Sequence, residues 1–178
     1  MFNYRINIVG AVIALAGVGG LAAAPAGAQP AAAVPTQLQP PAPATQLLRA
    51  NAQGVQIYAC TAKPGGGPEW ALKGPDATLT DDSGKTVAKH FAGPTWQAND
   101  GSKVVGEAVA NVPAPGGGAV AWLLLKAKSH EGAGEFAAVT FIQRLDTKGG
   151  VAPATGCDAG HIGQEVRVPY SAVYVLFK

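Results

Sequence analysis

Apolar and polar residues alternate with a period of two along most of the chain after residue 46. This period is typical of β-strands that have one face toward a core. The expected strands cover residues 54–60, 69–73, 77–81, 85–91, 95–98, 103–112, 119–128, 136–146 and 165–177. Gly- and Pro-rich turns separate them, and no segment here shows the 3.6-residue period of an amphipathic helix. The pattern predicts an all-β fold, a single-domain antiparallel β-sandwich or barrel of about eight or nine strands.

Two of these strands depart from simple alternation. The run Trp122-Leu123-Leu124-Leu125 is continuously apolar, which suits a strand that is buried on both faces. Pro169 interrupts the last strand, and proline lacks the N–H that a ladder needs. We therefore expect Pro169 at an edge strand or a bulge.

The first 28 residues have the pattern of a secretory signal peptide. Arg5 precedes an uncharged apolar run over residues 6–21, and Ala26-Gly27-Ala28 is a small-residue cleavage site. The alternative is an uncleaved membrane anchor, but the run is shorter than the roughly 20 residues that a spanning helix needs. We expect cleavage after Ala28, an extracytoplasmic (periplasmic or secreted) protein, and no membrane association of the mature chain.

Residues 29–46 are rich in Pro, Ala and Gln. Because proline is excluded from the interiors of helices and sheets, this segment is expected to be an extended or disordered tether. The all-β domain is then expected to cover residues 47–178.

Charge and motifs exclude several classes of partner. The chain has 13 Lys and Arg against 11 Asp and Glu, interspersed and without a basic run, so nucleic acid is not an expected partner. Gly84-Lys85-Thr86 resembles the end of a phosphate-binding loop, but Leu79 stands where the first glycine is required. The Gly-rich residues 132–137 precede a strand pattern instead of a helix, so no dinucleotide or other cofactor is expected.

The chain has two cysteines, Cys60 and Cys157. An even, small number of cysteines in a secreted chain indicates a disulfide. Such a bond would close a loop of about 97 residues, worth roughly 4 to 5 kcal/mol in the chain-entropy model. The alternative is a metal site that uses Cys157 and His161, but structural zinc sites usually have two such pairs, so no metal is expected.

The densest group of candidate residues lies between residues 90 and 107. In a functional interpretation, Trp96 is exposed and stacks on a sugar or flat ligand, with His90, Asp100 and Ser102 around it. In the structural interpretation, Trp96 is a core residue, while Asp100 and Ser102 cap their own turn.

Arg144 and Asp158 complete the set of candidates. Arg144 stands inside an expected strand, where a charge needs a partner. An ion pair with Asp158 or Glu107 is one explanation, and an anion-binding role is the other.

Catalytic patterns are weak. His90, His130 and His161 are far apart in sequence, and Ser102 lies in no recognised nucleophile motif. The best hypothesis is a module that binds a small molecule, glycan or envelope component. The alternatives are a hydrolase-like or metal-dependent enzyme and a structural envelope protein without a ligand site.

Four motifs occur in one order along the chain: WALKGPDATL at residues 70–79, HFAGPTW at 90–96 followed by DGS, FIQRLDTKGGVAP at 141–153, and RVPY at 167–170. In these motifs, residues 46–178 resemble a microbial secreted family catalogued as domain of unknown function number 3455. The resemblance implies an extracytoplasmic protein and assigns no activity, cofactor or site residues. Some fungal members carry a malate dehydrogenase label, but this chain has no dinucleotide-binding motif.

Overall fold

The structure, a computed structural model, describes Met1 and residues 33–178. Except for Met1, the expected signal peptide lies outside the described residues. Within residues 33–178 the chain forms eight β-strands and two short 3-10 helices, so the all-β prediction is confirmed. The strands are β1 (Gln46–Ala62), β2 (Pro68–Thr80), β3 (Thr86–Phe91), β4 (Thr95–Ala98), β5 (Lys103–Val112), β6 (Trp122–Glu131), β7 (Phe141–Gly149) and β8 (Glu165–Phe177).

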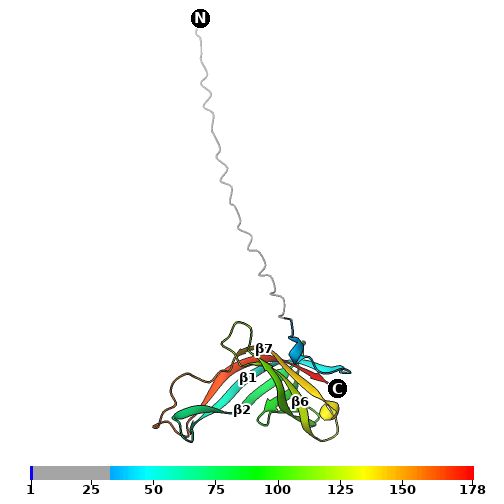
Figure 1. Ribbon diagram of the computed structural model, residues 1–178. Coiled ribbons are helices and arrows are strands. Elements are labelled where there is room, and N and C mark those ends of the chain that lie inside the picture. The colour runs from blue at the N-terminus through cyan, green and yellow to red at the C-terminus, as the bar shows by residue number, and fades with distance from the viewer. Residues whose placement is uncertain (2–32) are drawn as a thin grey trace. The chain divides into compact units, whose positions relative to one another are not determined.

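The strands form one antiparallel sheet in which each pairs with its neighbour in the sequence (Figure 1). The first and last strands also pair, from Gln46 opposite Phe177 to Ala59 opposite Glu165. This pairing closes the sheet into a barrel with no unpaired edge strand. One face of every strand therefore points into an enclosed interior.

Several boundaries differ from the sequence prediction. β1 begins at Gln46 instead of residue 54, and β6 covers Trp122–Glu131 instead of residues 119–128. The expected strands at residues 69–73 and 77–81 are one strand, β2, because the chain continues through Gly74 and Pro75 with a register shift opposite Ile57 and Tyr58. Phe136, which the alternation places in a strand, lies instead in the 3-10 helix η2 (Glu135–Ala138) that precedes β7.

Small residues line much of the interior. Six alanines point into the main core: Ala50, Ala52, Ala77, Ala88, Ala98 and Ala172. Their short side chains leave room for a few large ones, because the interior of an eight-stranded barrel is narrow. Trp96, Phe136 and Tyr174 fill most of this room and are at most 1% exposed.

One end of the barrel is closed by η2. Phe136 enters the core there, and two hydrogen bonds hold its segment in place. Asp100 Oδ2 accepts from the backbone N–H of Glu135 at 2.8 Å, and Ser102 Oγ accepts from that of Phe136 at 3.0 Å. The β4–β5 turn thus fixes the segment that covers its own end of the barrel.

The outer face of β6 and β7 is covered by residues before β1. The 3-10 helix η1 (Thr36–Leu38) places Leu38, which is fully buried, against Trp122 and Leu124. Gln143 Nε2 donates to the backbone oxygen of Leu38 at 2.7 Å. Part of the expected tether is therefore packed and ordered, which explains why the apolar run in β6 is buried on both faces.

Pro169 does not lie in an edge strand, because β8 pairs with both β1 and β7. Its carbonyl oxygen accepts from the N–H of Gly150, just beyond the last β7 residue. The missing N–H of Pro169 therefore faces a position where the β7 ladder has already ended, so no hydrogen bond is lost.

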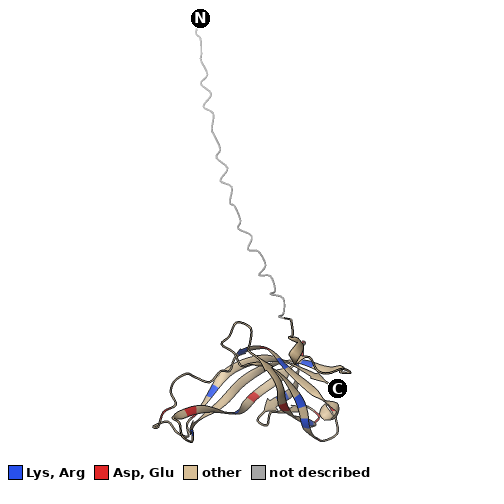
Figure 2. Cartoon of the chain, viewed as in Figure 1, with Lys and Arg blue, Asp and Glu red and all other residues tan. Residues whose placement is uncertain are grey.

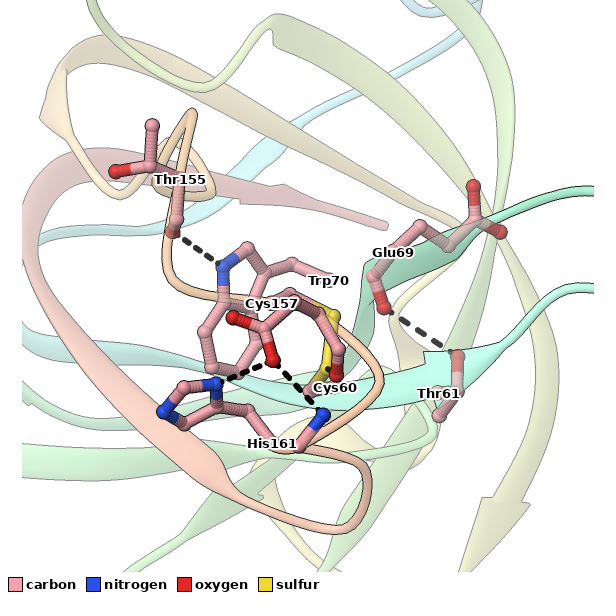
Figure 3. The surroundings of a disulfide bond; sticks show 9 residues. Cys60, Thr61, Glu69, Trp70, Thr155, Cys157 and His161 are labelled. Carbon is pink, nitrogen blue, oxygen red and sulfur yellow. Dashed lines mark hydrogen bonds and ion pairs between the residues drawn. A yellow bond between two sulfur atoms is a disulfide. The ribbon is translucent and has the colours of Figure 1, made fainter.

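The disulfide joins Cys60, near the end of β1, to Cys157 in the loop between β7 and β8. Figure 3 shows the packing around it. Trp70 Nε1 donates to the backbone oxygen of Thr155 at 3.0 Å, and His161 Nδ1 lies 2.7 Å from Asp158 Oδ1. The disulfide expectation is confirmed, and the bond ties a long loop to the body of the sheet.

Charged residues are spread over the strands and loops (Figure 2). Five of the described lysines and arginines form ion pairs with carboxylates at the surface, as Lys103 does with Glu131 at 2.8 Å. Among the described residues, no helix has the length and apolar character needed to cross a membrane.

We predict that the Cys60→Ala, Cys157→Ala double variant is less stable than the wild type by about 4 to 5 kcal/mol, because the bond closes a loop of 97 residues in the unfolded chain. Urea unfolding measures this difference. Reduction of the wild type serves as the control and has to reproduce most of it. An unchanged midpoint in both would contradict the prediction.

We also predict that Ser102→Ala costs about 1 to 3 kcal/mol, because it removes the acceptor of the buried Phe136 N–H. Ser83→Ala is the matched control. Ser83 makes the same two hydrogen bonds to Asp81 that Ser102 makes to Asp100, but in an exposed hairpin turn. The loss of stability caused by Ser83→Ala, measured by thermal unfolding, should stay within about 0.5 kcal/mol. Equal losses would show that the turn, and not the contact with η2, matters.

Candidate functional site

The interior contains a cavity of about 390 Å³. In an antiparallel barrel, alternate connections lie at opposite ends, and the β3–β4 turn is at the end away from η2. Gly93 and Pro94 of this turn border the cavity, as do Leu72 and Ala108, which are exposed. The cavity therefore opens at the end opposite η2.

Apolar side chains form much of the wall. Leu123 and Leu125 project from β6, and Pro75 adds a contribution from β2. Gly106 on β5 lies behind Trp96, where an added Cβ would come within 3.1 Å of the indole ring. The absence of a side chain at Gly106 thus leaves space for the indole.

Three aromatic rings form one cluster in the wall. The rings of His90 and Trp96 stack with centroids 4.2 Å apart and an angle of 12°. Tyr174 meets both rings edge-on, at 5.0 Å from His90 and 5.5 Å from Trp96. Strand pairing dictates this arrangement, because His90 lies opposite Trp96 in the β3–β4 ladder.

His90 is a neutral group in this cluster. Burial lowers its pKa to about 3, and the positive charge of Arg144 acts in the same direction. His90 Nδ1 lies 2.9 Å from the backbone oxygen of Thr95, which can only accept, so Nδ1 carries the proton. Nε2 is then left as a hydrogen-bond acceptor.

Two buried donors of the cavity wall have no hydrogen-bond partner among the described residues. They are Gln56 Nε2 and Trp96 Nε1, and each side chain is only 1% exposed. An unpaired buried donor costs on the order of 1 to 3 kcal/mol. Such groups are rare in a finished core, and each needs an explanation, such as a partner that the chain itself does not supply.

Arg144 places a positive charge in the same wall. It lies opposite Leu123 of β6 and Tyr174 of β8, and its Nε donates to the backbone oxygen of Ala121 at 3.0 Å. It has no ion pair with any described carboxylate. The ion pair considered for it with Asp158 or Glu107 is therefore not formed.

The cavity brings together His90, Trp96 and Arg144 from the sequence-predicted candidates. Trp96 is not an exposed platform for a sugar, because the closed sheet buries it. Asp100 and Ser102 lie at the opposite end, where they support η2. Asp158 is exposed beside the disulfide, and its hydrogen bond from His161 lowers the pKa of its carboxyl group.

Sequence reasoning missed Gln56 and Tyr174. In β1 the more polar face, with Gln56, Tyr58 and Cys60, is the buried one, while Val55 and Ile57 are only half-buried. The alternation shows two faces but not which of them lines a polar cavity. The glutamine between two β-branched residues was the available signal.

The described residues do not assemble the serine–histidine or three-histidine schemes that were considered from the sequence. Ser102 Oγ donates to Asp100 at 2.6 Å and accepts from the N–H of Phe136, and it has no hydrogen bond with a histidine of the described residues. The three histidines make separate contacts: His90 with Thr95, His130 with Val139 and His161 with Asp158. Residues 33–178 contain no group of three or more His, Cys, Asp or Glu side chains that could hold a metal.

Because the pKa of His90 is low in the folded state, we predict that stability falls as the pH drops below about 6.5, the ordinary histidine value. The unfolded chain takes up a proton there and the folded chain does not. The free energy of unfolding should continue to fall down to a pH of about 3, and its slope against pH should include a contribution of one proton from His90. Urea unfolding between pH 8 and pH 4 tests this, and His90→Phe should reduce the slope by that amount. An unaltered slope in this variant would refute the assignment.

Comparison with known proteins assigns the chain to a family but gives no function. No curated protein and no solved structure was found to match it. The family model described as "Protein of unknown function (DUF3455)" matches residues 41–178, which include all eight strands of the closed sheet. The chain therefore belongs to the DUF3455 family of proteins of unknown function.

Proposed function

We propose that this protein is a binding module that holds one small, largely apolar molecule inside its barrel. One observation carries the proposal. The wall of one apolar cavity of about 390 Å³ contains an arginine without a counter-ion and two residues with buried donors that have no partner among the described residues. Ligand sites in proteins are typically apolar pockets with a few convergent polar groups. Eight-stranded barrels have an interior that can hold one small ligand.

The two rival hypotheses have less support. A purely structural envelope protein needs only a surface patch and leaves the cavity and its unpaired donors unexplained. A hydrolase needs a nucleophile beside an oriented base, whereas the described residues that line the cavity with His90 include no Ser, Thr, Cys, Asp or Glu. A glycan would need an open stacking surface, and Trp96 is enclosed.

We also propose an extracytoplasmic location. The Cys60–Cys157 disulfide supports it, because disulfides persist mainly in oxidising compartments. The charged, apolar and small-residue segments at the N-terminus have the order of a secretory signal.

The test uses the neutral fluorescent probe N-phenyl-1-naphthylamine. We expect its emission to rise on binding to the wild type. Ala108→Trp should weaken binding by about tenfold or more, equivalent to about 1.4 kcal/mol, because residue 108 borders the cavity mouth.

Val109→Trp is the matched control. Val109 is adjacent in β5, is 53% exposed and does not line the cavity. Binding by this variant should equal that of the wild type. Equal binding by Ala108→Trp, or failure of the wild type to bind both this probe and an apolar carboxylate such as 2-naphthoate, would refute a cavity ligand.

A further inference from the structure

The charges around the cavity restrict the kind of ligand. The lining residues include two cations, Lys73 and Arg144, and no Asp or Glu. Lys73 pairs with Glu165 on the exposed side of the sheet, so its charge is already compensated. Arg144 is left as the one uncompensated charge among the described residues that line the cavity.

We propose that the ligand is an ionised carboxylic acid with an apolar body, and that Arg144 binds its carboxylate. This inference rests on the proposed function and adds the chemical class of the ligand. A guanidinium presents a planar fork of N–H donors that matches a carboxylate. Nε is already bonded to Ala121 and the guanidinium also contacts the Tyr174 hydroxyl, so the remaining N–H groups of the two terminal nitrogens are those available to a ligand.

The unpaired donors fit the same ligand. Gln56 Nε2 and Trp96 Nε1 can only donate, and a carboxylate can only accept. The two residues come from β1 and β4, so with Arg144 on β7 they approach the cavity from three sides of the barrel. A ligand that offered only donors would leave Trp96 Nε1 and the guanidinium of Arg144 without acceptors.

His90 does not supply a second charge. It is neutral at physiological pH, because burial lowers its pKa to about 3. Preference for an anion over a neutral molecule of the same shape therefore depends on Arg144. One substitution should accordingly remove the charge preference without removing the cavity.

The experiment compares 2-naphthoate with its neutral isostere 2-naphthamide by isothermal titration calorimetry. The wild type should bind the naphthoate at least about tenfold more tightly than the amide. Arg144→Met should weaken naphthoate binding by about 30-fold or more and change amide binding by less than about threefold. Arg144→Lys, which keeps the charge but not the planar fork, should fall between the two.

Two controls locate the effect. Lys126→Met removes the same charge from the exposed face of β6 and should leave both affinities unchanged. In ¹H–¹⁵N spectra the indole resonance of Trp96 should shift with ligand, while that of Trp122 should not. The Trp122 Nε1 is also unpaired, but it lies in the outer cluster with Leu38.

The outcomes separate the two proposals. Equal affinity for both compounds, or equal loss of both in Arg144→Met, would overturn the carboxylate assignment and leave the cavity function standing. The carboxylate assignment is likewise overturned, and the cavity function kept, if neither compound binds but N-phenyl-1-naphthylamine does. If none of the three compounds binds the wild type, both proposals are wrong.

Discussion

The pairing of β1 with β8 is the constraint that makes every other feature of the structure possible. It joins the two strands that lie furthest apart in the sequence and removes both edges of the sheet. Closure also gives the sheet an inside, which must be filled by side chains or left as a cavity. Near η2 the alanine-rich wall closes around Phe136 and other large side chains, and toward the other end it leaves space.

That space gives the polar residues of the wall their significance. In an open sheet, Gln56, Trp96 and Arg144 could reach water, and their hydrogen-bonding groups would need no explanation. Inside a closed sheet each buried donor without a partner is costly, and Arg144 stands half-buried in the wall of the open cavity without a carboxylate partner. The carboxylate ligand that we propose would offset the charge of Arg144 in this wall.

The two ends of the barrel have different roles. At one end Asp100 and Ser102 hold η2 across the opening through backbone hydrogen bonds. At the other end the disulfide fixes the β7–β8 loop beside β1, and Tyr58 donates to the backbone oxygen of Gly150 at 2.6 Å. The loop is thus attached at the cavity end of the barrel, and none of its residues is among those that line the cavity.

Local features of this protein could be predicted from the sequence alone. The period of two and the turn residues depend on near neighbours in the chain, and two cysteines allow only one disulfide. These features were sufficient for the all-β class, most strand positions, the disulfide, and the candidacy of His90, Trp96 and Arg144. The folded chain was needed to show that Gln56 faces inward, that Asp100 and Ser102 support η2, and that Arg144 has no carboxylate partner. These properties depend on which strands pair and on which side of the sheet becomes the interior, and alternation is the same for either side.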